Sequence, residues 1–194
     1  MRTQILFLLP VIALAVGCAP VATSSPTPLP AETSAPTAAP PSATAAAGPA
    51  LTETFSSNLH GISVSYPGGW VPTAATEPWP EGEIVLQETL FADVIEDGSV
   101  SDTAFLALAS QPLGGKSVDQ WAADYLAFEE CGQAEPVVVD GAQGVMGPDC
   151  PMALVAAADR GYLIWLYRID DPYWFQEILA TVQLNPEIAL DAAP

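Results

Sequence analysis

Residues 152–169 read MALVAAADRGYLIWLYRI, two apolar runs separated by Asp159-Arg160-Gly161. The second run is rich in aromatic and β-branched side chains, which favour extended backbone. A turn triplet between two such runs predicts a β-hairpin, with strands at 152–158 and 162–169. It is the strongest hairpin signal in the chain.

Further strands are expected before this hairpin. Val137–Val139 and Ala142–Met146 flank the dipeptide Asp140-Gly141, which favours a two-residue turn. Alternating or continuous apolar residues also predict extended segments nearer the N-terminus. These segments are 62–66, 70–71, 84–91 and 103–110.

Two segments carry apolar side chains at helical spacing. The first, 117–129, begins with Ser117 and has Gln120 three positions later, the pattern of a capping box. The second, 171–184, begins with Asp171 as a cap and Pro172 at the first helical position. Hairpins with one helix between them and another after them predict the α+β class, with helices covering an antiparallel sheet.

The N-terminus has the features of an export signal. Arg2 precedes the apolar run Ile5–Val16, which Pro10 interrupts and which is shorter than the ~20 residues that span a bilayer. The sequence Ala15-Val16-Gly17-Cys18 then resembles a bacterial lipobox. This resemblance implies cleavage after residue 17 and lipidation of Cys18, with a palmitate-type acyl chain. An ordinary secretory signal with an incidental cysteine is the alternative.

Residues 18–50 are expected to form a disordered linker. Between positions 19 and 50 the chain has 11 Ala, 9 Ser or Thr and 8 Pro, with Glu32 as the only charge. Such a composition buries too little apolar surface to offset the entropy of ordering. Residues 51–194 are then expected to form one globular domain, held on a lipid-anchored stalk whose glycosylation the composition leaves open.

Charge and hydropathy divide between these segments. The whole chain has 4 Lys and Arg against 23 Asp and Glu, a net charge of -19, yet its mean hydropathy is +0.31. The apolar character belongs to the signal and the linker, whereas 22 of the acids lie in 51–194. This excess of negative charge argues against nucleic-acid binding, because such binding depends on Lys and Arg side chains that neutralise phosphates. A partner is expected to be basic.

Several residues give the domain a family resemblance. The stretch Tyr66-Pro67-Gly68-Gly69-Trp70, the helix with Trp121, the late hairpin and the aromatic C-terminal helix resemble the PsbP-like family. The likeness covers about Thr54 to Leu184. It implies an α/β/α sandwich and, because relatives are often accessory subunits, a non-catalytic role. No functional residue of that family is carried over to this chain.

The remaining cysteines are expected to pair. Cys131 and Cys150 form a pair in an exported chain, where disulfides persist. A metal site is the alternative, but the chain has one histidine and no second cysteine at short spacing, so no metal or other cofactor is expected. Closing a loop of about 20 residues would contribute ~3 kcal/mol.

A contact surface is predicted around one loop tryptophan and one acidic turn. Trp79 lies between Pro78 and Pro80, where periodicity does not require burial. The acidic turn could collect a hard cation, although it lacks two ligands of an EF-hand, so weak Ca²⁺ binding remains a minor alternative. The residues of this turn are Asp93, Glu96, Asp97 and Asp102.

No catalytic set is assembled by the sequence. His60, the only histidine, is expected in a turn rather than in a pocket, and Gly114-Gly115-Lys116-Ser117 lacks the first glycine of a P-loop. The expected function is a lipid-anchored extracytoplasmic domain that binds an envelope protein or a small ligand. The alternatives are an envelope hydrolase using two carboxylates, and a purely structural module.

Overall fold

The structure is a computed structural model that describes residues 48–84, 90–98, 104–147, 149–168 and 172–191. The predicted signal peptide, Cys18 and most of the linker lie outside these ranges. Neither of the helices within them is long and apolar enough to cross a membrane.

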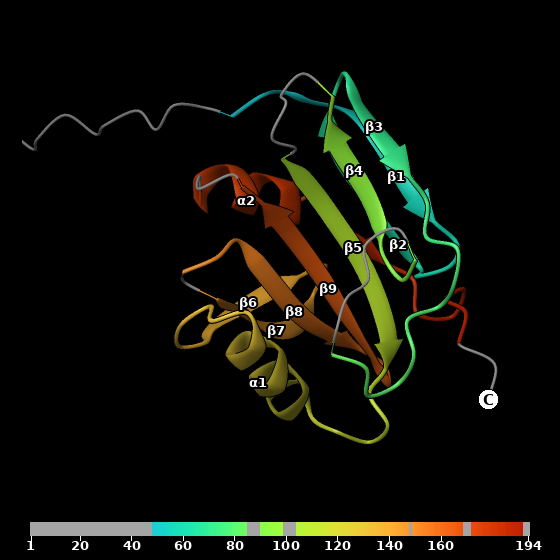
Figure 1. Cartoon of the computed structure of the whole chain (residues 1–194), viewed down its shortest axis with the longest axis vertical. Helices are drawn as coiled ribbons and strands as arrows, with labels where there is room; N and C mark the ends of the chain where they lie inside the picture. Colours follow the sequence, from blue (N-terminus) through green and yellow to red (C-terminus); the bar gives the residue numbers. More distant parts are fainter. Residues whose placement is uncertain (1–47, 85–89, 99–103, 148, 169–171, 192–194) are drawn as a thin grey trace, which may run out of the picture. The chain divides into compact units, whose positions relative to one another are not determined.

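Ten strands in the described ranges form two antiparallel sheets (Figure 1). The larger sheet has the order β3 (Trp70–Thr73), β4 (Asp93–Asp97), β5 (Phe105–Pro112), β9 (Arg160–Tyr167), β8 (Met152–Ala157), β7 (Ala142–Gly147) and β6 (Glu135–Val139). The smaller sheet has the order β1 (Leu51–Ser57), β2 (Ile62–Pro67) and β10 (Gln183–Leu184).

The larger sheet is covered on both faces. Helix α1 (Val118–Phe128) and the segment around Trp79 pack on one face, and helix α2 (Pro172–Leu179) and the smaller sheet pack on the other. Each face has its own apolar core, because successive side chains of β5, β8 and β9 point to opposite sides. The predicted α+β class, with a sheet between helices, is confirmed. The second sheet was not predicted.

Both late hairpins are present, and one has a different turn. Asp140 and Gly141 have φ of 49° and 77°, the left-handed backbone of a two-residue turn between β6 and β7. Between β8 and β9 the turn is Ala158-Asp159, so the prediction of 159–161 was wrong. Gly161 lies inside β9, and a Cβ there would come within 3.0 Å of Leu113 and of the Trp121 ring.

The helices confirm the capping argument and correct one boundary. Ser117 Oγ accepts the N–H of Gln120, and Gln120 Oε1 accepts the N–H of Ser117. Helix α2 ends at Leu179 rather than at 184, and Gln183–Leu184 pairs with β2 instead. Thr181 donates its hydroxyl to the carbonyl of Ile178 and accepts the N–H of Ser65 on β2, which holds the chain beside that strand. Asp171, the predicted cap, lies outside the described residues.

The strand predicted at 84–91 is not found in its described part. Positions 85–89 lie outside the described residues, and Ile84, Leu90 and Phe91 are not in a strand. The carbonyl of Leu90 instead accepts the N–H groups of Thr76 and Glu77. The strand that pairs with β5 is β4, a few residues later.

Candidate functional site

A groove of about 530 Å³ lies between α1 and the β6–β7 hairpin. Its floor is mostly apolar, and it stays open because several of its residues are small. Gly144 is required there, since a Cβ would collide with the carbonyl oxygen of Leu154 on β8. The lining residues are Val118, Asp119, Ala122, Ala123, Ala134, Pro136, Gln143, Gly144 and Val145.

A second groove, of about 280 Å³, lies on the other side of β6, against α2. Pro136, Val137, Val138 and Met146 line it from the hairpin, Gln176 and Leu179 line it from the helix, and Ala180 lines it just after the helix. Strand β6 therefore separates two shallow apolar grooves. We call the strand together with its two grooves the β6 edge.

The charged side chains around the β6 edge are acidic. Strand β7 has no charged residue, and the charged residues of α1, β6, the β6–β7 turn and α2 are Asp119, Asp124, Glu135, Asp140 and Glu177. Lys116, just before α1, lies 3.8 Å from Asp124, and both side chains are exposed. Such a surface pair stabilises little. This edge of the domain presents apolar surface within a negative rim.

Trp79 does not belong to any exposed surface, so its predicted role as a contact residue was wrong. Its side chain is 0% exposed and packs 5.5 Å from the Tyr125 ring and 6.1 Å from the Trp121 ring, measured between centroids. The indole is too large and apolar to remain in water when a helix face lies within reach.

The predicted acidic turn is largely strand β4. Asp93 is buried and its Oδ1 accepts the N–H of Ala75 at 2.8 Å, so it was wrongly placed on the surface. Glu96 and Asp97 are half-buried neighbours, and their side chains point to opposite faces of the sheet. They therefore cannot converge on one ion. Asp102 lies outside the described residues. Within the described ranges no cluster of His, Cys, Asp and Glu could hold a metal.

The predicted disulfide between Cys131 and Cys150 is confirmed, with Cα atoms 5.3 Å apart. It ties the end of α1 to the segment before β8. The loop is closed further by the N–H of Asp149, which donates to the carbonyl of Cys131 at 3.3 Å. Gly147 passes against Cys131 so closely that a Cβ would lie 2.6 Å from the cysteine Cβ.

His60 is buried at the junction of the two sheets, contrary to the expectation of a turn outside any enclosed site. It does follow β1 in a turn, but its ring points inward. Ser110 of β5 donates its N–H to His60 Nδ1 at 3.0 Å and its hydroxyl to the His60 carbonyl at 2.9 Å. Arg160 of β9 donates to Ser110 Oγ at 3.1 Å. The sequence gave no local signal for this cluster, because its members lie far apart along the chain.

The geometry of this cluster is structural rather than catalytic. The lone pair of His60 Nδ1 accepts the Ser110 backbone N–H at 3.0 Å, and the Ser110 hydroxyl lies closer to the His60 carbonyl, at 2.9 Å, than to Nδ1, at 3.4 Å. Burial lowers the pKa of His60, although the nearby Asp93 carboxylate opposes this. A neutral imidazole then carries its proton on Nε2. The backbone of Phe91 lies close enough to the imidazole to oppose the lowering of its pKa as well.

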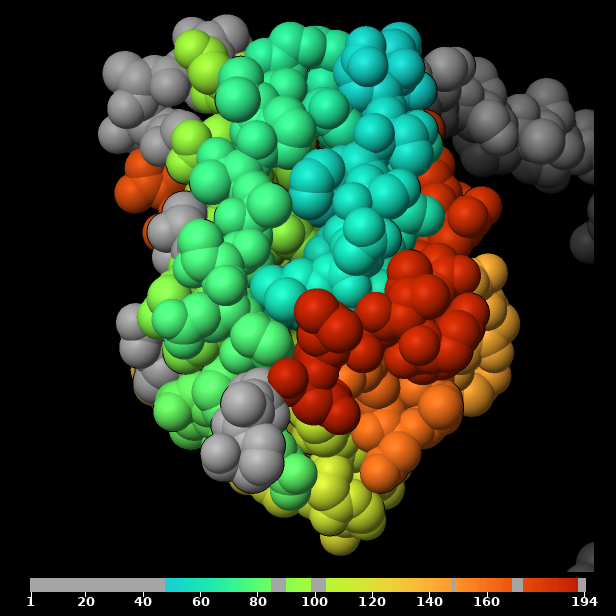
Figure 2. Space-filling model, turned by 90° about the vertical axis from the view of Figure 1, so that its right-hand side faces the viewer, coloured from blue at the N-terminus to red at the C-terminus, as the bar shows by residue number. Residues whose placement is uncertain are grey.

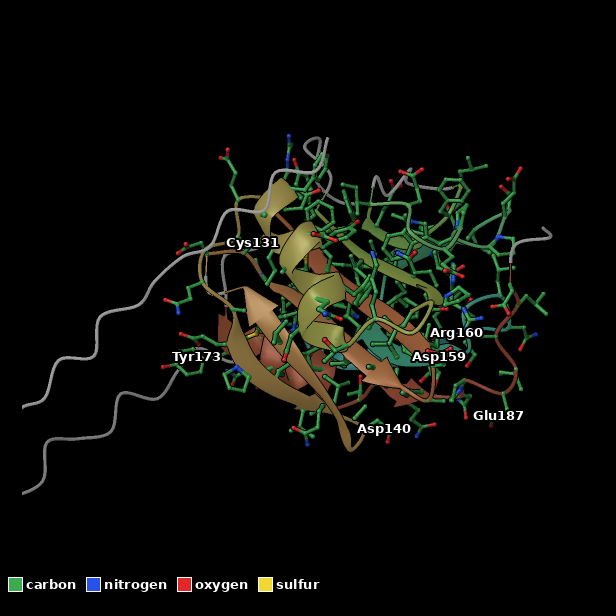
Figure 3. The ribbon with its side chains drawn as sticks, turned by 90° about the horizontal axis from the view of Figure 1, so that it is seen from below. Cys131, Asp140, Asp159, Arg160, Tyr173 and Glu187 are labelled. Carbon is green, nitrogen blue, oxygen red and sulfur yellow. A yellow bond between two sulfur atoms is a disulfide. The ribbon has the colours of Figure 1, made fainter. Side chains whose placement is uncertain are left out.

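A third, small groove contains two carboxylates. Asp159 and Asp191 line it together with Arg160, and Arg160 forms an ion pair with Asp191. Asp159 and Arg160 lie side by side at the turn between β8 and β9 (Figure 3). The ion pair commits one of the two carboxylates to a structural contact. A glycosidase-type pair needs one carboxyl group with a raised pKa. Among the described carboxylates, partial burial raises the pKa of Glu129, which ends α1 and does not line any of these three grooves.

Comparison with known proteins gives two weak structural similarities. No family model and no curated protein matches the sequence. The solution structure of cyanobacterial PsbP (CyanoP) from Synechocystis sp. PCC 6803 superposes with a TM-score of 0.44 at 12% identity, over 74% of this chain and 99% of that one. A crystal structure from Bacteroides thetaiotaomicron VPI-5482 gives 0.43 at 10% identity, over 70% of this chain.

This chain spans 49% of the Bacteroides protein, about half its length. At such similarity neither structure informs the function of this one. Membership of the PsbP-like family stays a prediction.

Proposed function

We propose that this chain is a lipid-anchored, extracytoplasmic binding domain that docks another protein of the cell envelope and performs no catalysis. The lipobox-like Cys18 and the Ala- and Pro-rich linker support an anchored domain on a tether. Acyl chains on one cysteine would supply the two membrane signals that stable anchoring needs.

The β6 edge is the observation that carries the binding role. Its larger groove has an apolar floor and one ionisable lining residue, Asp119. A site of this kind offers buried contact area and no acid and base pair. Apolar grooves with a few polar groups are the usual form of a recognition site.

The anchor is tested by cell fractionation. Cys18→Ala should release the chain from the membrane fraction, or leave its signal uncleaved, whereas Ser24→Ala in the linker should change nothing. Membrane attachment and processing of Cys18→Ala identical to the parent chain would contradict lipidation.

The binding role is tested by crosslinking in cells, followed by purification of the chain from membrane extracts. The domain should recover a specific envelope protein above a control that carries the signal and linker alone. Recovery of no such protein, together with no shift in melting temperature across a panel of envelope ligands, would oppose a binding role and favour a purely structural module.

The hydrolase alternative has its own test at the third groove. Asp159→Asn and Asp191→Asn should leave any hydrolysis of cell-envelope glycans unchanged if the domain only binds. Loss of a measured hydrolytic activity in both variants would establish the alternative instead.

A further inference from the structure

Strand β6 is an outer strand of the larger sheet, and no strand of the described residues pairs with its second side. The two-residue turn makes Val139 and Ala142 a hydrogen-bonded pair, and such pairs alternate along an antiparallel ladder. Val137 and Glu135 therefore bond to β7. The backbone groups of Pro136 and Val138 point away from the sheet, and within the described residues no hydrogen bond reaches them.

An extended peptide laid along this side would find binding surface on both faces. Side chains of a strand alternate between faces, so every second residue would enter the groove against α1 and the others the groove against α2. Val138 is 59% exposed at the centre of the edge and would be covered by the added strand. Backbone pairing with alternating pockets is the general form of β-strand addition.

Charge selects the kind of peptide. The acids of the rim, Asp119, Glu135, Asp140 and Glu177, have no basic residue among them on the same elements. The β6–β7 turn carrying Asp140 projects at the end of the hairpin (Figure 3). We propose that the β6 edge binds an extended, basic segment of a partner protein by β-strand addition. This inference rests on the proposed binding function and names the chemistry of its partner.

The same features disfavour pairing of two copies through this edge. Two β6 strands side by side would bring Glu135 and Asp140 of one copy near those of the other, and like charges placed opposite destabilise a strand pair. Pro136 has no N–H, so the edge offers the N–H and carbonyl of Val138 and the carbonyl of Pro136. A short edge with a proline resists self-association, yet these three groups suffice to set the register of a peptide with complementary charge.

The test measures binding of fluorescent ten-residue peptides to the purified full-length chain by anisotropy. The probe alternates valine and lysine, and two comparison peptides alternate valine and glutamate or carry the probe's residues in separate blocks. The alternating basic peptide should bind most tightly. Equal binding of the block peptide would mean attraction by charge alone and would overturn the inference.

Variants locate the site. Glu135→Lys and Asp119→Lys should each weaken binding of the basic probe about tenfold, the equivalent of ~1.4 kcal/mol. Glu53→Lys, an exposed acid on the outer strand β1 of the other sheet, is the matched control and should leave affinity unchanged. Val138→Pro, which removes the outward N–H, should abolish binding, and far-UV circular dichroism reports whether that variant folds.

Hydrogen exchange on the unmodified chain gives a readout without any substitution. The probe should protect the Val138 amide. Unchanged exchange at Val138 with the probe bound would overturn the inference, as would tighter binding of a peptide of residues 20–47 or a concentration-dependent dimer of the unmodified chain. If Glu135→Lys still recovers a cellular partner as well as the parent chain does, the β6 assignment fails while the binding function stands. If neither recovers one, the binding function itself fails.

Discussion

Replacing Trp79 by alanine distinguishes a buried core residue from an exposed contact residue. A buried tryptophan side chain removes roughly 150–250 Å² from water, equivalent to about 4–6 kcal/mol at ~25 cal/mol per Å². That area is an upper bound, because the unfolded chain already buries part of it. Since Trp79 is 0% exposed, Trp79→Ala should lower the free energy of unfolding by about 3–5 kcal/mol. An exposed contact residue would change it by less than ~0.5 kcal/mol.

Urea denaturation of the purified chain, followed by far-UV circular dichroism, measures this difference. With an m-value of ~1–3 kcal/mol per M, the midpoint should fall by at least ~1 M. Phe128→Ala is the matched control, because Phe128 is an aromatic residue on the same helix as Trp121 and Tyr125 but is 52% exposed. If Trp79→Ala behaves like Phe128→Ala, the packing of Trp79 described above is incorrect.

Two further predictions concern the disulfide and the buried histidine. The double variant Cys131→Ser, Cys150→Ser should lose ~3 kcal/mol of stability by the loop-closure estimate; a melting temperature equal to that of the parent chain would contradict it. Because burial lowers the pKa of His60, the unfolded chain takes up its proton first as pH falls below about 6.5, so stability should decline there. His60→Asn keeps an acceptor for the Ser110 N–H and cannot titrate, so its stability should depend less steeply on pH between 7 and 5; identical slopes would count against this account.

The sequence correctly predicted the caps and turns that depend only on residues close together in the chain. The capping box of Ser117 and Gln120 and the Asp140-Gly141 turn each depend on neighbouring residues, and both are where the sequence indicates. The prediction of a turn at Gly161 was wrong because this position needs a glycine for another reason: it packs against Trp121, a residue 40 positions away in the sequence. A glycine serves equally in a turn or under a bulky ring, and the sequence alone does not distinguish them.

Strands β1 and β10 escaped prediction for a related reason. Strand β1 is exposed at most positions, and β10 has two residues, so neither shows a clear apolar period. Their pairing comes from long-range contacts with β2. The His60 cluster is also non-local. It forms where one turn and two strands come together in space, and no residue spacing in the sequence predicts that contact.

The grooves of the β6 edge were not predicted from the sequence either. Pro136 and Gly144 both line the larger groove, and a Cβ at Gly144 would collide with the carbonyl oxygen of Leu154. Whether a surface is hollow depends on which elements face each other, and this information is not present in one segment. The rim charges, in contrast, were foreseeable from composition.

The point where the linker joins the domain has a mechanical consequence. Trp174 of α2 donates its indole N–H to the carbonyl of Pro49 at 3.2 Å, and β1 begins two residues later beside β2. Figure 2 shows β1 (cyan) at the surface. If the N-terminal segment is the tether proposed above, tension on it would load the Pro49–Trp174 hydrogen bond first and the Leu51–Pro67 end of the β1–β2 ladder next. A hairpin pulled from its open end separates one pair at a time, so the smaller sheet would yield under force before the larger sheet that carries the β6 edge.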